Sequence, residues 1–150
     1  MATNGILVTQ FDYAKLFVWN NKFATGTYTN ATGSTVTLAK GTIMGRVDAT
    51  GKVYPHVSTA TNGSQIPRFI LANAYTVANG ASVTVTFCTM GDVAIEGITY
   101  GGSDTSTTPI LFSDSSAAAT TTRAGLIIDI LAENNIRLVS TTENTYADNA

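Results

Sequence analysis

The sequence predicts an all-β protein with one short C-terminal helix, built as an irregular barrel-like or clip-like assembly of sheets. Three observations support this prediction. Only 12% of the residues are charged, about half the usual share, so threonine, serine, asparagine and glycine must cover most of the surface. Residues 82–90 alternate apolar and hydroxyl side chains, which is the period of a half-buried strand. Glycine and asparagine mark frequent turns between short apolar runs.

The 150 residues are enough for one compact domain with its own core and too few to suggest two. We expect an aromatic N-terminal segment at residues 1–23, a β-rich domain at 24–140 and a polar tail at 141–150. The N-terminal segment has the highest density of aromatic residues in the chain. Its apolar spacing fits a strand and a helix equally well, so its secondary structure stays open.

The next segments predict two hairpins. Residues 25–29 and 35–38 are threonine-rich strands that a short turn joins into the first hairpin. Residues 42–47 and 53–54 form the second, and Gly51 in its loop can adopt a positive φ angle. These hairpins open the β-rich domain.

The middle of the chain continues as strands. Residues 68–72 predict a short strand, and residues 74–80 predict a reversal of the chain. The alternating strand at 82–90 is the clearest in the sequence, and it places Phe87 on one face and Cys88 on the other. We interpret Cys88 as a structural thiol, because no neighbouring base is visible that would lower its pKa.

The pattern changes toward the C-terminus. Gly91 is expected to bend the chain, and a short strand follows at 109–112. A helix is predicted with Thr122 as its N-cap and an end near Asn134-Asn135, before a closing strand at 136–139. The helix prediction rests on apolar residues at three- and four-residue spacing, namely Ala124, Ile127, Ile128 and Leu131.

Charge and composition exclude several partners. The net charge of −2 comes with no basic stripe, which argues against nucleic-acid binding. The single cysteine excludes an intramolecular disulfide. The N-terminus lacks a basic signal region, and no apolar stretch approaches the roughly 20 residues that span a bilayer. We therefore expect a protein that folds in a reducing cytoplasm, has no membrane association and has a protein as its partner.

No group of residues predicts an active site. His56 is the only histidine, expected at the surface, and no G-x-S-x-G turn supplies a nucleophile for it. Asp92 and Glu96 would share a strand face like a glycosidase pair, but we expect two solvated acids. Asp104 and Asp114 lack the acidic ladder of a calcium loop. The sequence thus predicts a protein that is no enzyme, with no cofactor, metal or small-molecule substrate.

One stretch of the chain resembles a known family. The segment Leu38–Tyr54 reads LAKGTIMGRVDATGKVY, and it is followed by Asn62-Gly-Ser-Gln65 and by Phe69-Ile-Leu-Ala72. This order of pieces resembles the lambda-type head decoration proteins of tailed bacteriophages. The resemblance covers residues 34–98 well and 123–139 more loosely, and Phe69 stands where a glycine is common.

The resemblance implies a homotrimer that binds the major capsid protein on the outside of an expanded phage head and stabilises the head against internal DNA pressure. It implies a place in the virion after synthesis in the bacterial host cytoplasm. In this family the residues before the first hairpin lie on the capsid as an arm. We therefore predict capsid-binding residues in the aromatic segment, namely Phe11, Tyr13, Leu16, Phe17 and Trp19. The same side chains are compatible with a place in the core, and both interpretations stay open.

A second function comes from a different class. A carbohydrate-binding β-module or a fibre domain would use exposed aromatic rings, Trp19 and tyrosines among them, as platforms on which sugar rings stack. A specific signal on a glycan array, without binding to capsids, would favour that alternative.

Overall fold

The computed structural model describes residues 16–113 and 122–140. In chain order the elements are β1 (Phe17–Thr29), β2 (Val36–Leu38), β3 (Ile43–Arg46), β4 (Val53–Pro55), β5 (Phe69–Leu71), β6 (Tyr75–Val77), β7 (Ser82–Ala94), η1 (Ile95–Gly97), β8 (Pro109–Ser113), β9 (Thr122–Leu126), α2 (Ile127–Glu133) and β10 (Ile136–Val139). Strands dominate, and the seven-residue α2 is the one α-helix of the described residues. The predicted tail at 141–150 lies outside them.

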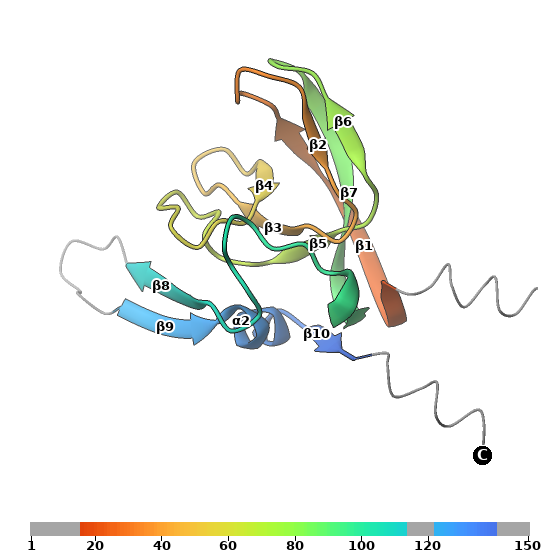
Figure 1. The fold of residues 1–150 in the computed structure, drawn as a ribbon, viewed down its shortest axis with the longest axis vertical. Helices are drawn as coiled ribbons and strands as arrows, with labels where there is room; N and C mark the ends of the chain where they lie inside the picture. The colour runs from red at the N-terminus through yellow and green to blue at the C-terminus, as the bar shows by residue number, and fades with distance from the viewer. Residues whose placement is uncertain (1–15, 114–121, 141–150) are drawn as a thin grey trace, which may run out of the picture.

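Six strands form the main sheet, and four more form two small ribbons (Figure 1). The main sheet has the order β1-β7-β5-β3-β4, and β10 pairs in parallel with β7. The ribbons are β2–β6 and β8–β9. The predicted all-β class with one short helix is confirmed, and the sheets do not close into a barrel. β1 is consequently an edge strand, whose one pairing partner within the described ranges is β7.

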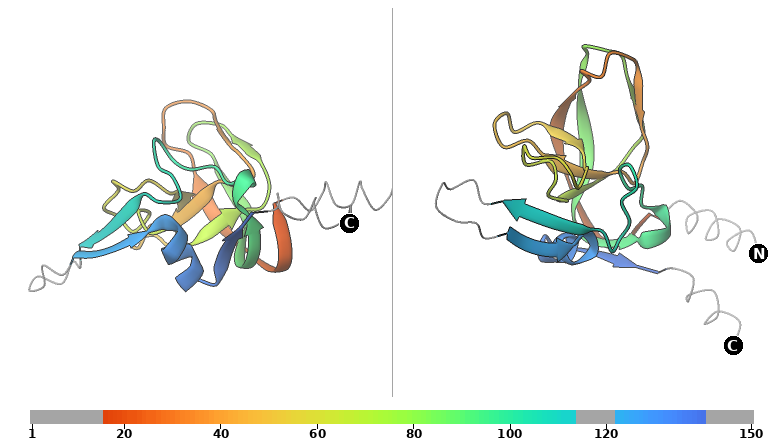
Figure 2. Two further views of the ribbon diagram at one scale, coloured as in Figure 1. Left: turned by 60° about the horizontal axis from the view of Figure 1, so that its bottom comes forward. Right: turned by 60° about the vertical axis from the view of Figure 1, so that its left-hand side comes forward.

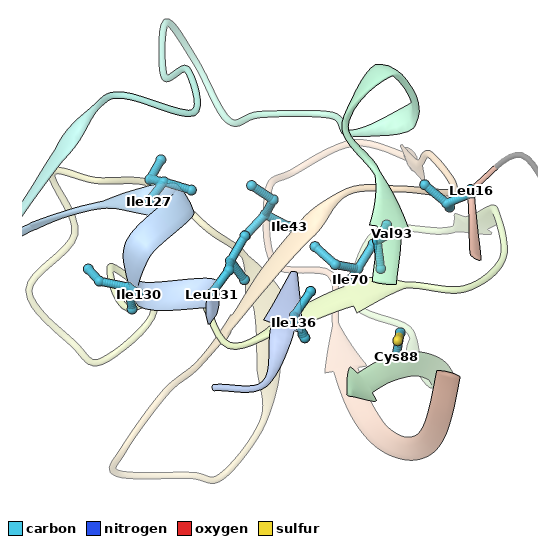
Figure 3. Close-up of a cluster of buried hydrophobic side chains, with 9 residues drawn as sticks. All are labelled: Leu16, Ile43, Ile70, Cys88, Val93, Ile127, Ile130, Leu131 and Ile136. Atoms are coloured by element: carbon cyan, nitrogen blue, oxygen red, sulfur yellow. The ribbon is translucent and has the colours of Figure 1, made fainter. Parts of the chain in front are cut away.

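Two separate cores lie on the two faces of the sheet around β7. The helix-side core (Figure 3) contains Leu16, Ile43, Ile70, Cys88, Val93, Ile127, Ile130, Leu131 and Ile136. The ribbon-side core contains Tyr28, Leu38, Met44, Val53, Leu71, Val77, Val85 and Phe87. Phe87 and Cys88 therefore face opposite sides of β7, as the alternation predicts.

The two cores give the molecule three layers. α2 covers one face of the sheet, and the β2–β6 ribbon covers the other. The β8–β9 ribbon leads into α2 and extends away from the body of the molecule (Figures 1 and 2). No helix among the described residues has both the length and the apolar character needed to cross a membrane.

The second predicted hairpin is confirmed. β3 and β4 pair antiparallel, with Gly45 opposite Tyr54, and Gly51 in the loop has a φ angle of 68°. Gly45 also lets the loop at residues 62–65 pack directly on β3, because a Cβ at this position would overlap the carbonyl oxygen of Ser64. The residues on which the family resemblance rests therefore form a turn and strands that the fold requires.

The first predicted hairpin is wrong in its pairing. Residues 25–29 and 36–38 are strands, but β1 pairs with β7 and β2 pairs with β6. The predicted reversal at 74–80 likewise contains β6 before its turn. Both errors have one cause, because the partner strands lie more than 35 residues away along the chain, where a local pattern carries no information about pairing.

The helix begins later than predicted. Thr122 is not an N-cap, because residues 122–126 form β9 and pair with β8. α2 starts at Ile127, and no side chain caps it; the backbone N–H groups of Ile127 and Ile128 donate to the carbonyl oxygens of Thr108 and Ser106 instead. The predicted end at Asn134-Asn135 is confirmed. β7 also continues through Gly91, whose φ angle is 120°.

Candidate functional site

The N-terminal half of β1 exposes large apolar side chains at the edge of the main sheet. Trp19 has 72% of its surface exposed and Phe23 has 49%, and Val18, the residue before Trp19, is also exposed. Aromatic side chains normally bury most of their area, so a tryptophan this open is an unusual feature. We call Phe17, Val18, Trp19 and Phe23 the aromatic end of β1.

The aromatic end of β1 is attached to the helix-side core. Leu16 is 6% exposed and belongs to the helix-side core, and Phe17 packs against that core. The rings of Phe17 and Phe23 meet edge to face with their centroids 5.1 Å apart. The Lys40 Nζ lies 5.7 Å from the centroid of the Phe17 ring, within cation–π range. Phe17 therefore connects the core to the exposed surface.

The pairing of β1 with β7 is irregular where the aromatic residues lie. Phe17 is opposite Val93, Trp19 is opposite Asp92, and the register shifts between these pairs, again before Lys22 and a third time between Lys22 and Phe23. In the first two places β1 contains one residue more than β7, which is the definition of a β-bulge, and in the third the extra residue belongs to β7. Asn20, inside the second bulge, has a φ angle of 51°. Figure 2 shows the bend of β1 at this end.

An ion pair lies in the same row of the sheet as Trp19. Asp92 is the cross-strand partner of Trp19 on one side and of Arg137 on the other. Arg137 donates from its Nε to Asp92 Oδ1 at 3.0 Å and from its terminal nitrogen to Oδ2 at 2.6 Å. These bonds hold the pKa of the Asp92 carboxyl below its usual range.

This pairing weighs against the weak glycosidase interpretation of Asp92 and Glu96. The lowered pKa of Asp92 does not suit the general acid of such a pair, and both oxygens of its carboxylate accept hydrogen bonds from Arg137. Glu96 accepts a hydrogen bond from Ser140 Oγ at 2.8 Å. Both carboxylates therefore have structural partners.

The five predicted capsid-binding residues fall into three groups. Phe11 and Tyr13 lie outside the described residues. Leu16 is in the core, so we do not count it as part of a contact surface. Phe17 is half-buried and Trp19 is exposed, so the structure keeps these two at the candidate site. Within this segment, some side chains therefore belong to the core and others to the surface.

Sequence reasoning missed Val18 and Phe23, which also belong to the exposed set. Phe23 lies in the same aromatic run as Trp19, four residues after it, so the run could have indicated Phe23 as a candidate contact residue. Val18 carried no signal in the sequence, because it is the extra residue of the first bulge.

His56 is fully buried, which corrects the expectation of a surface histidine. Its Nε2 lies 2.8 Å from the carbonyl oxygen of Gln65, and its Nδ1 lies 3.7 Å from Asp104 Oδ2. Ser58 Oγ donates its proton to Asp104 Oδ1 at 2.6 Å, so the hydroxyl is directed at the carboxylate. The three side chains therefore join two loops rather than form a nucleophile and base. Across residues 16–113 and 122–140, no three potential ligands gather as a metal site.

Comparison with protein families gives a match. The family model described as bacteriophage lambda head decoration protein D matches residues 15–119, which is well over half of the chain. No curated protein matches the sequence. The matched region begins one residue before Leu16 and includes β1 to β8. The chain belongs to the lambda head decoration protein D family, a family of proteins that decorate phage capsids.

Proposed function

We propose that this chain is a virion structural protein that binds the outside of an expanded phage capsid through the aromatic end of β1 and the residues before it. The observation that carries the proposal is the exposure of Trp19, at 72%, on an edge strand of a family member. The proposal includes Phe11 and Tyr13 as further contacts. The partner is the major capsid protein.

The chemistry of the surface fits a protein partner. Interface hot spots are enriched in tryptophan, and burying such a ring removes a large apolar area from water. Among residues 16–113 and 122–140, no strand pairs with the outer edge of β1, to which an extended segment of a partner can add by backbone hydrogen bonds. In this arrangement the backbone gives general affinity and the rings of Trp19 and Phe23 give the anchors.

We propose further that three copies act together as a homotrimer. Once one copy is bound, the others attach at a high effective concentration, so three weak contacts become one strong attachment. A rigid trimer that spans neighbouring capsid subunits would hold them together against the pressure of packaged DNA. This function requires no turnover.

The test is occupancy of expanded capsids that lack decoration protein. Trp19→Ala is expected to raise the concentration for half-occupancy by about 30-fold or more, the size of a 2 kcal/mol hot spot. Its thermal unfolding should change little, because the ring is mostly exposed. Val57→Ala removes another exposed apolar side chain, outside β1, and should bind like the unchanged protein. Equal occupancy by the Trp19→Ala variant would contradict the proposal.

The exposed Trp19 also supports carbohydrate binding as a second candidate. Of the tryptophan and tyrosines that the structure describes, Trp19 alone would serve as an open platform, since Tyr28 is buried and Tyr54, Tyr75 and Tyr100 are half-buried. A glycan array separates the two functions. Specific glycan signals that Trp19→Ala removes, together with no attachment to capsids, would favour the carbohydrate-binding module.

A further inference from the structure

We infer that the two bulges in β1 position Trp19. Asn21 and Gly91 hold the exposed indole ring in the orientation in which it contacts the partner. The inference rests on the proposed function, because it assigns the residues that orient the proposed anchor. It concerns side chains that do not themselves form the exposed surface.

The first bulge turns Trp19 outward. Residues two apart in a regular strand share a face, so Trp19 would follow Phe17 toward the helix-side core. Phe17 is opposite Val93, which lies in that core, whereas Trp19 is opposite Asp92, the next residue of β7. The extra residue in this bulge therefore shifts Trp19 to the opposite face. A bulge is a recurrent means of redirecting a side chain.

The second bulge lies directly after Trp19 in β1. Asn20 and Asn21 together occupy the space opposite Gly91, between the pairs Trp19–Asp92 and Lys22–Met90. Asn20 has a φ angle of 51°, a left-handed conformation that asparagine tolerates better than most residues. Trp19 is thus bracketed by two irregularities, and the backbone on each side of it is fixed.

Asn21 ties this bulge to β7. Its Nδ2 donates to the carbonyl oxygen of Asp92 at 3.0 Å, and it lies 3.6 Å from Cys88 Sγ in the helix-side core. Asp92 is the residue directly opposite Trp19. The amide therefore fixes the backbone of the same pair that sets the direction of the indole ring.

Gly91 is the second residue that positions Trp19. A Cβ at this position would lie 2.7 Å from the carbonyl oxygen of Trp19 and 2.6 Å from Asn21 Nδ2. Its φ angle of 120° also favours glycine. Because both obstacles belong to the bulged strand, a side chain at Gly91 would push β1 and Trp19 away from β7.

The experiment uses Trp19 as its own probe, since it is the only tryptophan in the chain. Time-resolved fluorescence anisotropy should show that Asn21→Ala and Asn21→Asp, which both lack the amide donor, widen the local motion of the indole. Both should raise the half-occupancy concentration on expanded capsids by about tenfold. Asn20→Gly keeps the positive φ angle and should match the unchanged protein in both readouts, whereas Asn20→Val should behave like Asn21→Ala.

The two claims fail separately. If Trp19→Ala lowers occupancy but Asn21→Ala changes neither anisotropy nor occupancy, the positioning role is wrong and the proposed function stands. If the indole of Asn21→Ala becomes more mobile while Trp19→Ala binds normally, the positioning role stands and the proposed contact is wrong. Near-ultraviolet circular dichroism, read below the unfolding transition, checks that each variant retains its packed core.

Discussion

His56 lies buried between two loops, and its two ring nitrogens face different acceptors. Nε2 contacts the carbonyl oxygen of Gln65, so it carries the proton, and Nδ1 faces the Asp104 carboxylate at 3.7 Å. Nδ1 has no hydrogen-bond partner among the described residues. Burial lowers the pKa of His56, against the opposing effects of Gln65 and Asp104. The imidazole is therefore neutral at pH 7.

This burial predicts an acid-sensitive stability. The unfolded chain binds a proton at His56 near pH 6.5, whereas the folded chain binds it only at lower pH. The contribution is complete above about pH 6.5 and is lost as the pH falls through the folded-state pKa, with a slope of at most about 1.4 kcal/mol per pH unit. Urea unfolding between pH 7.5 and 5 measures it. His56→Gln should flatten the curve, and an unchanged slope in that variant would refute the assignment.

The sequence did not reveal the burial of His56, because it depends on a loop almost 50 residues away. Gly101 lets that loop touch the His56 carbonyl, where any Cβ would overlap the oxygen. Asp104 then accepts bonds from the backbone and the hydroxyl of Ser58. Residue types alone marked these positions as loop, and only the contact between the loops turns them into a buried polar cluster.

At the scale of elements, the structure of β1 explains why the apolar spacing of this segment fitted a strand and a helix equally well. Alternation was visible in residues 82–88 because β7 pairs with β1 there without a register shift, and the predicted strand is confirmed. In β1 the two bulges each insert one residue, so Phe17 and Trp19, although two residues apart, pair with adjacent residues of β7 and face opposite sides of the sheet. The bulges that made the strand ambiguous in the sequence therefore also place Trp19 at the surface.

Tertiary pairing also overrides the local pattern in the segment before α2. Residues 122–126 pair with β8, although apolar spacing favoured a helix from Thr122. The helical spacing is real only from Ile127 onward, where three side chains enter the helix-side core. A distant partner strand therefore decided where the helix begins.

Two truncations separate the roles of the N-terminal segment. Deleting residues 1–15 leaves Leu16 and β1 in place, so the protein should stay folded and lose capsid occupancy. Deleting residues 1–23 also removes a buried leucine and half of β1, and should lower the free energy of unfolding by at least about 3 kcal/mol. Urea denaturation and capsid occupancy are the measurements. Normal stability after the longer deletion would show that this half of β1 contributes nothing to the core.

At the scale of the whole molecule, β7 lies between two cores, and β1 is the edge strand of the main sheet in the described part of the chain. The composition predicted the all-β class, and the hairpin motif predicted the family, which the match over residues 15–119 supports. The motif packs inside the fold, where Gly45 meets Ser64. It therefore identifies the scaffold and leaves the contact surface to be found elsewhere on the molecule.

Cryo-electron microscopy of expanded capsids, incubated with and without this protein, tests the central claim most directly. The account predicts additional density on the outer surface that fits three copies of the chain, with the aromatic end of β1 of each copy facing the major capsid protein. Capsids incubated with Trp19→Ala at the same concentration should show weak density or none. Density in which Trp19 faces solvent, or capsids that gain no density, would contradict the account.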